Sequence, residues 1–489
     1  MMRLSRILAV VMFLLLLPSV VSAQWWWGSQ FFDESGVNFT PQGASTRARG
    51  MGNAYLALSD DVAGATWNPA GAAYMPEGQA TLEFLTNTTT MDYSGTATNG
   101  NPRDYQYETN DGIFNNFGYI SPVRFYHRDF AIGINYYRMA DFSKEYDIND
   151  DDYQSEYYMK FGLEVIKLTA ATQVIPNIAL GVNGNIYIRG FTEDYLQTYP
   201  GAYEVIGSDT TRSPYHVENK ASYSGVNFDI GLQGRFGALS LGAVLNTPYT
   251  LTQESTLKQA IVVPHYGEQG TYVNSDLEID FPIGIGVGAA YTANNLTVSA
   301  DYSMHQFSET RWSMHPIFVD ASYTFFEPYD PTDPNVEVNP YWEDINQYRI
   351  GAEYMLNISR FGVPLRAGYR NDPKVYSDKQ LIYGIETTET GERQYSIPLG
   401  TDTEVGNSET YDQVVGYIVS LGTGLKYKNF WLDFAYEFGS AEQEITSIFA
   451  EIEDIDDDGT IEWGNVITEN QETIEENPSR LFITLSMTF

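Results

Sequence analysis

The clearest group of metal-binding side chains lies near the C-terminus, in the sequence DIDDDGTIE at residues 454–462. Carboxylates at alternate positions supply the oxygen ligands that Ca²⁺ prefers, and Gly459 permits the sharp turn of an EF-hand loop. The twelfth position is Asn465, where such a loop has a bidentate glutamate, so a solvated acidic loop is the alternative interpretation. The residues of this candidate calcium site are Asp454, Asp456, Asp458 and Thr460.

The sequence motifs that would predict a catalytic site are weak or absent. The chain has no Cys, and its five His are scattered without the spacing of metal ligands. Neither a nucleophile elbow nor a phosphate-binding loop is found, and the GxGxG at residues 284–288 lies in an alternating segment that predicts a strand. We therefore expect no enzyme and no required cofactor. A hydrolase whose Ser and His come together only in the fold is the remaining alternative.

Composition narrows the class of protein. The formal net charge of −37 argues against a nucleic-acid partner, which requires a basic surface. Aromatic residues are abundant, with 37 Tyr, 26 Phe and 8 Trp, and there are 42 Gly. That makeup is typical of sheets with one apolar and one polar face, as in membrane barrels.

The N-terminus predicts export. Arg3 and Arg6 precede an apolar run at residues 7–17, and small residues follow at 21–23. We therefore assign residues 1–23 to a signal peptide. No later run of about 18 apolar residues predicts a membrane-spanning helix.

The elements that would position any site are strands. At residues 295–302, Leu296 and Val298 alternate with Thr297 and Ser299, which sorts apolar and polar side chains onto opposite faces. Such segments predict about fourteen strands. Their expected spans are 79–91, 113–121, 129–139, 161–175, 178–190, 225–236, 238–246, 281–292, 295–306, 347–357, 362–370, 413–427, 430–439 and 480–489.

The connections between these segments alternate between short and long. Long ones are expected at 92–112, 140–160, 191–224, 247–280, 307–346, 371–412 and 440–479. This alternation is typical of an antiparallel outer-membrane barrel with short periplasmic turns and long outer loops, and an even strand number places both chain ends in the periplasm. The fold class is therefore all-β: a transmembrane barrel at residues 77–489. The acidic net charge does not suit binding to anionic lipid through a basic patch. The final strand ends on Phe489 with apolar residues at every second position, which resembles the signal read by the barrel-assembly machinery.

The segment at residues 43–76, GASTRARGMGNAYLALSDDVAGATWNPAGAAYMP, resembles the N-terminal hatch of the FadL family of outer-membrane transporters, which includes OmpP- and TodX-like members. The segment is rich in small residues and lacks sustained alternation, so it suits a plug inside a lumen better than a spanning strand. A disordered tail is the alternative, although the apolar content disfavours it. We assign residues 24–76 to the hatch. The candidate gating residues that match the motif are Gly50, Gly52, Asn68, Pro69 and Ala70.

The resemblance implies a mechanism: outer loops capture a small hydrophobic compound, a lumenal pocket binds it, and it leaves sideways through the barrel wall when the hatch shifts. Fatty acids and hydrocarbons are the expected ligand classes, with outer-membrane lipid as the surroundings and a monomer as the working unit. The acidic loops favour a neutral ligand; cations for a carboxylate could come from Arg189, Lys220, Arg235 and Arg349. Gly133, in the third strand, could mark the wall opening. A PorV-like barrel that assists a protein-secretion system is the alternative function.

Overall fold

The structure is a computed structural model of the whole chain. It describes residues 42–96, 102–149, 154–198, 204–206, 209–211, 215–263, 267–314, 336–338, 342–387, 393–401, 412–455 and 461–489. The proposed signal peptide and residues 24–41 lie outside the described residues. No helix in the described ranges is long and apolar enough to cross a bilayer.

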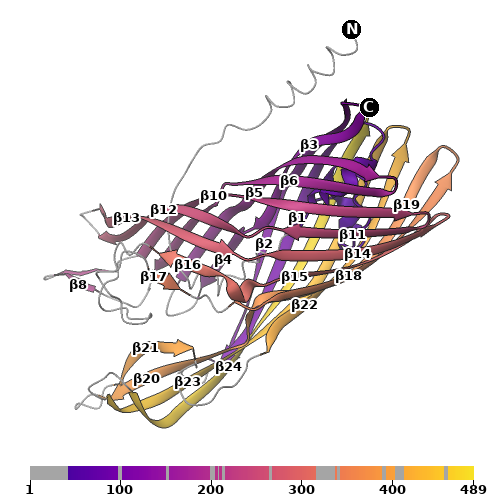
Figure 1. Cartoon of the computed structure of the whole chain (residues 1–489). Helices are drawn as coiled ribbons and strands as arrows, with labels where there is room; N and C mark the ends of the chain where they lie inside the picture. Colours follow the sequence, from indigo (N-terminus) through magenta and orange to yellow (C-terminus); the bar gives the residue numbers. More distant parts are fainter. Residues whose placement is uncertain are drawn as a thin grey trace.

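Fourteen antiparallel strands close into a barrel (Figure 1). Each strand pairs with the next along the sheet, and the first strand pairs with the last, Gln79 opposite Thr488, so the barrel has no free edge. All fourteen predicted strands are present. They are β1 (Gln79–Thr96), β2 (Pro102–Phe125), β3 (Arg128–Asp141), β5 (Gln154–Ile175), β6 (Ile178–Ile188), β10 (Tyr215–Phe236), β11 (Leu239–Asn246), β14 (Gly284–Ala293), β15 (Leu296–His305), β18 (Ile345–Ile358), β19 (Phe361–Ser377), β22 (Gln413–Tyr427), β23 (Phe430–Ile455) and β24 (Ile461–Thr488).

Tight two-residue turns join these strands at one end, which we call the turn end. They require backbone conformations with positive φ, as at Asn177 (70°), Asn294 (53°) and Lys428 (53°). The start of β1 and the end of β24 lie at the same end of the barrel (Figure 1). The opposite end, which we call the loop end, carries every long connection. The predicted alternation of short and long connections is thus confirmed.

The two faces of the barrel wall differ in polarity. Apolar side chains on the outer face are exposed, for example Val226 (59%) and Leu421 (55%). Polar side chains on the inner face are buried, for example Asn183 and Arg370. Exposure of a band of apolar residues is unfavourable in water and favourable in lipid, so the outer face of this wall is suited to a membrane.

The prediction that the long connections are loops is wrong in one respect, because much of their length forms paired strands. Extensions of β5 and β10 continue beyond the barrel and pair with β4 (Lys144–Asn149), β7 (Phe191–Thr198) and β12 (Tyr249–Val263). The same outer sheet includes β13 (Gly267–Phe281), β16 (Arg311–Met314) and β17 (Val336–Val338). These segments lack the long apolar alternation of the wall, so the sequence pattern did not reveal them, although their backbones still pair.

A second extension lies at the loop end, where β23 and β24 run well past the predicted limits of residues 439 and 480. They pair with each other as far as Ile455 and Ile461, and β20 (Lys379–Thr387) joins β23 in parallel. Figure 1 shows this extension apart from the one that carries β12, β13 and β16. The remaining short strands are β21 (Arg393–Thr401), β8 (Glu204–Ile206) and β9 (Asp209–Thr211).

The predicted strand at 281–292 begins too early. Phe281 ends β13 and is buried inside the barrel (4% exposed), whereas Ile285 and Val287 of β14 are exposed on the outer face. Pro282 and Ile283 belong to neither strand. Because this break interrupts the two-residue period, Phe281 does not share a face with the residues that follow.

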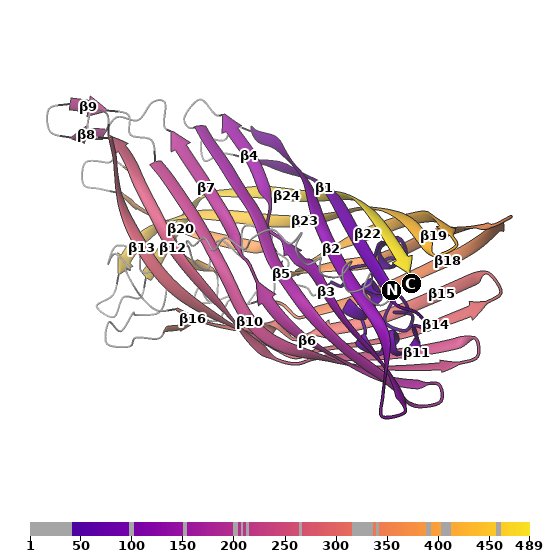
Figure 2. The ribbon, with the colours of Figure 1, turned by 90° about the horizontal axis from the view of Figure 1, so that it is seen from above.

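The segment before β1 lies within the barrel near the turn end (Figures 1 and 2). It contains one turn of α-helix, α3 (Thr46–Gly50), and two short 3₁₀ helices, η1 (Ala63–Thr66) and η2 (Pro69–Tyr74). A further 3₁₀ turn, η3 (Phe307–Glu309), follows β15. We call residues 42–78 the lumenal segment.

Candidate functional site

Strands on several sides of the barrel hold the lumenal segment by hydrogen bonds. Asp301 of β15 accepts from the backbone N–H groups of Tyr55 (2.6 Å) and Leu56 (2.8 Å). Gln233 of β10 donates to the carbonyl oxygens of Ala57 (2.6 Å) and Leu58 (2.9 Å). These polar side chains satisfy backbone groups that the short, irregular helices leave unpaired. The segment is therefore docked, because specific hydrogen bonds fix its position inside the barrel.

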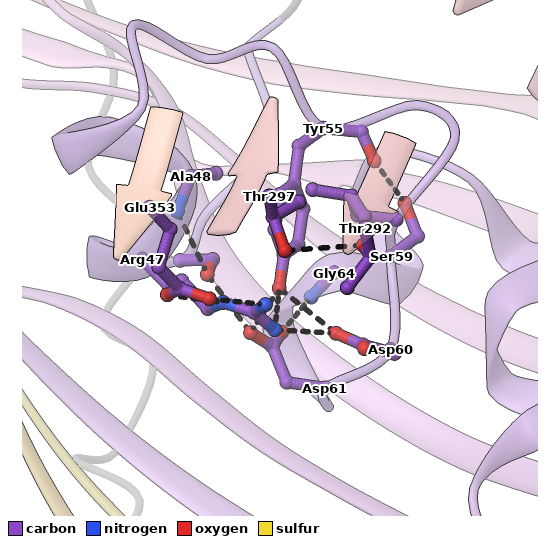
Figure 3. Close-up of polar contacts among 12 residues, drawn as sticks. Arg47, Ala48, Tyr55, Ser59, Asp60, Asp61, Gly64, Thr292, Thr297 and Glu353 are labelled. Carbon is purple, nitrogen blue, oxygen red and sulfur yellow. Dashed lines mark hydrogen bonds and ion pairs between the residues drawn. The ribbon is translucent and has the colours of Figure 1, made fainter. Parts of the chain in front are cut away.

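Arg47 forms an ion pair between the lumenal segment and the wall (Figure 3). Its guanidinium donates to both carboxylate oxygens of Glu353 on β18 (2.9 and 2.8 Å) and to Asp60 (2.6 Å). Tyr55 donates to the adjacent Asp61 (2.7 Å), and burial raises the pKa of the Asp61 carboxyl despite this bond and the nearby Arg47. A bidentate arginine–carboxylate pair fixes orientation as well as distance.

Close backbone contact, made possible by glycine, also seats the lumenal segment. Gly52 has φ of 61°, and a Cβ there would lie 2.5 Å from the backbone nitrogen of Tyr369. On the wall, a Cβ at Gly368 would lie 2.0 Å from the backbone nitrogen of Gly52. Neither position has room for a side chain, because backbone meets backbone.

The candidate gating residues all lie in this docked segment. Gly50 ends α3, where an added Cβ would come within 3.0 Å of Gly422. Asn68 is extended (φ −145°) and caps η2 by accepting from Ala70 N (3.1 Å), with Pro69 as the first helical residue. The Asn68 amide also donates to the carbonyl oxygens of Leu56 (2.9 Å) and Leu232 (3.1 Å), which joins the segment to β10.

On the loop-end side of the lumenal segment, aromatic and aliphatic side chains converge inside the barrel. We call this group the aromatic cluster. Tyr249 stacks between Tyr187 and Phe281, with ring centroids 4.7 and 4.9 Å away. Other members include Tyr137, Phe142, Phe191, Tyr223, Leu251, Ile279, Phe307, Trp312 and Trp342. An apolar lumen is unusual, since membrane barrels generally have a polar interior.

Sequence reasoning missed the aromatic cluster. Phe142, Phe307, Trp312 and Trp342 belong to stretches predicted as outer loops. The available signal was the occurrence of large aromatic side chains in otherwise polar connections, which water-exposed loops rarely require.

A cavity of about 40 Å³ lies between the lumenal segment and the wall. Trp67 and Gly43 line it from the segment, and Ser303, His305 and Arg349 line it from β15 and β18. His305 stacks on Phe307 of the aromatic cluster, with centroids 5.7 Å apart, so the cavity borders that cluster. It has room for a few water molecules or one small ion.

The four candidate cations do not form one site. Arg189 pairs with Glu164 (3.0 Å), Arg235 donates to the carbonyl oxygen of Leu58 (3.2 Å), and Lys220 is half-buried on β10. Arg349 alone among them lines the cavity.

The candidate calcium residues Asp456, Asp458 and Thr460 lie outside the described residues, and Asp454 is described only as part of β23. Within the described ranges no three His, Asp or Glu side chains gather as a metal site. Phe489 is half-exposed on the outer face and its backbone N–H donates to Gly78 O (2.8 Å).

The wall is interrupted between β2 and β3. Their backbone pairing ends at Asn116 and Tyr137, after which β3 pairs only with β5 and its register shifts between Arg138 and Ala140. Pairing through Gly133 is regular on both sides. We call the interruption the β2–β3 seam; it lies at the loop-end side of residue 137, rather than at the glycine.

The closed wall with its apolar outer band and its occupied lumen defines a membrane-spanning β-barrel with an internal plug. Its fold is that of FadL-type outer-membrane channels. A FadL homologue from Pseudomonas aeruginosa is similar with a TM-score of 0.58 and 13% identity, over 92% of this chain and 99% of that chain. The toluene transporter TodX from P. putida is similar with a TM-score of 0.53 and 13% identity, over the same shares of the two chains. Comparisons of the sequence with family models and with curated proteins find no match.

Proposed function

We propose that this protein is an outer-membrane channel that admits small hydrophobic compounds, with its turn end and both chain ends in the periplasm. The observation that carries the proposal is the aromatic cluster. An apolar lumen offers no favourable contacts to a polar solute. An apolar solute, by contrast, gains about 25 cal/mol of free energy for each Å² of its surface that it buries there. The known function of TodX as a toluene transporter agrees with this assignment.

The order of sites along the lumen supports capture before passage. A compound that enters from the loop end meets the aromatic cluster first and the docked lumenal segment second. The segment then obstructs direct passage, because the hydrogen bonds that Asp301 accepts and Gln233 donates, and the ion pair of Arg47, hold it in place. The lumenal segment therefore acts as the hatch that the sequence predicted, and movement of this segment opens the route.

The β2–β3 seam is the route that we propose for lateral exit. The wall there lacks the backbone hydrogen bonds that close it elsewhere, and Tyr137 of the aromatic cluster lies at its edge. A membrane strand needs about 9–11 residues to cross, so the seam begins near the loop-end border of the apolar band. Sideways exit returns an apolar compound to lipid without a passage through water.

Replacement of Phe281 with alanine is expected to weaken toluene binding about tenfold, because Phe281 contacts Tyr249, Phe307 and Trp342. Titration calorimetry of the purified barrel in detergent measures the affinity. Phe228→Ala is the matched control, since Phe228 is exposed on the outer face (51%). Equal toluene affinity in the two variants, or no binding by the unmodified protein, contradicts the proposed function.

A calcium site at the outer end of the β23–β24 hairpin is a separate proposal. It is supported by the alternate carboxylates and by the absence of Lys and Arg between Lys428 and Arg480, which leaves the acidic charge without local compensation. Conversion of Asp454, Asp456 and Asp458 to asparagine is expected to abolish the rise in Tm that Ca²⁺ produces. The same change made at Asp92, Asp104 and Asp111 of the β1–β2 hairpin is the control. An unchanged calcium response in the first variant rules the site out.

A further inference from the structure

The cavity beside the aromatic cluster has a lining suited to a negatively charged group. Arg349 is 4% exposed and donates only to the neutral Gln347 side chain (2.9 and 2.5 Å). It makes no ion pair with any residue that the structure describes, and its guanidinium also lies over the ring of Trp67. A buried guanidinium without a carboxylate partner is unfavourable unless another negative group compensates its charge.

Two neighbouring polar side chains are also unsatisfied. His305 is 7% exposed and Ser303 is 4% exposed, and in the described part of the chain neither the two ring nitrogens nor the hydroxyl has a hydrogen-bond partner. Both residues follow Asp301 along the inner face of β15, and Ser303 lies opposite Gln347 on β18. The three side chains thus bring a guanidinium, a hydroxyl donor and an imidazole to one small space.

Among the described residues, no carboxylate lines this cavity. Lys167, which does line it, is neutralised by Asp229 (2.6 Å). Asp301 lies opposite Arg349 in the sheet, but it accepts hydrogen bonds from the lumenal segment and makes no ion pair with Arg349. The carboxylates of Asp301 and Asp372 act on Arg349 from beyond ion-pair distance, and the guanidinium groups of Arg370 and Arg49 oppose them. Water alone would therefore leave the charge of Arg349 only partly balanced.

We propose that the cavity binds one small monovalent anion, of the size of chloride or bromide, between Arg349, His305 and Ser303. The volume of about 40 Å³ has room for one such ion. Because Gly43 and Trp67 of the lumenal segment form the other side of the cavity, the bound anion joins that segment to the barrel wall. Anion binding therefore stabilises the docked position of the segment.

The anion is tested by thermal unfolding of the full barrel in detergent, in sodium chloride or sodium gluconate at equal ionic strength. Chloride is expected to raise Tm by about 3 °C in a saturable way, and Arg349→Gln is expected to lose that rise. Arg480→Gln is the matched control, since Arg480 also faces the lumen and donates to the neutral Asn87 (3.2 Å) but does not line the cavity. It is expected to keep the chloride effect.

Crystals grown in sodium bromide give a direct measurement on the unmodified protein, which decides the matter even if Arg349→Gln does not fold. An anomalous peak beside Arg349 and His305 is expected. A cavity that holds water but no bromide overturns the proposal, and so does a Tm that is equal in chloride and gluconate. A chloride effect of the same size in Arg349→Gln also overturns it.

Discussion

Replacement of Arg370 with methionine is expected to lower the free energy of unfolding by about 3–5 kcal/mol. Arg370 is fully buried in the lumen and donates to both carboxylate oxygens of Glu437 on β23 (2.6 and 3.0 Å). Glu437 is 1% exposed, so removal of Arg370 leaves a buried carboxylate without a cation in contact, although Arg49 and Arg480 act on it from beyond ion-pair distance. Denaturant unfolding in detergent micelles, followed by tryptophan fluorescence, measures the loss.

Two controls show whether the loss comes from the unpaired charge. Arg370→Met combined with Glu437→Leu is expected to recover most of the stability, because apolar replacement of a whole buried ion pair is often close to neutral. Arg124→Met breaks an ion pair with Asp129 (3.4 Å) whose side chains are 72% and 78% exposed, and is expected to change stability by less than about 1 kcal/mol. A loss as large in Arg124→Met as in Arg370→Met would contradict the explanation.

Replacement of Gly368 with valine is expected to displace the lumenal segment while the barrel stays closed. A Cβ at Gly368 would lie 2.0 Å from the backbone nitrogen of Gly52 and 2.2 Å from the carbonyl carbon of Met51, and backbone atoms have little freedom to move away. Overpacking of about 1–3 kcal/mol raises the undocked fraction about 5- to 150-fold. Swelling of liposomes that contain the protein measures the resulting permeability to small sugars.

Gly184→Val is the matched control, because an added Cβ at Gly184 meets only the ring of Phe228, at 3.7 Å. This variant adds the same side chain to the same barrel and is expected to leave permeability unchanged. If the two variants admit sugars at the same rate, the contact between Gly52 and Gly368 does not hold the segment in place.

The sequence predicted the barrel because strand alternation is a local property. Thr297 and Ser299 face inward and Leu296 and Val298 face outward wherever β15 lies in the sheet, since successive side chains of any strand point to opposite faces. The count of such segments predicted about fourteen strands, and the alternation of short and long connections predicted an antiparallel barrel. Where the apolar face of a strand covers only a few positions, as at Tyr249 and Leu251 of β12 or Ile279 and Phe281 of β13, this local signal is weak and the prediction of a loop was wrong.

The lumenal segment was also predictable in part. Its small residues and its lack of alternation distinguished residues 43–76 from the strands. The short helix that begins after Asn68 was not predicted. The sequence did not reveal which wall residues would meet it. Gly368 comes more than 300 residues after Gly52. Its sequence neighbourhood does not distinguish it from the other glycines of alternating strands, because its contact with Gly52 forms only when the barrel closes around the segment.

The sequence by itself determined a fourteen-strand wall with one apolar face, because a two-residue period and turn-forming residues act over a few positions of the chain. Only the tertiary structure decided what the lumen contains. The aromatic cluster, the ion pair between Arg47 and Glu353, and the cavity beside Arg349 each join residues from distant strands or from the lumenal segment. Such contacts depend on strand register and closure, and these are set by the whole sheet rather than by any local pattern.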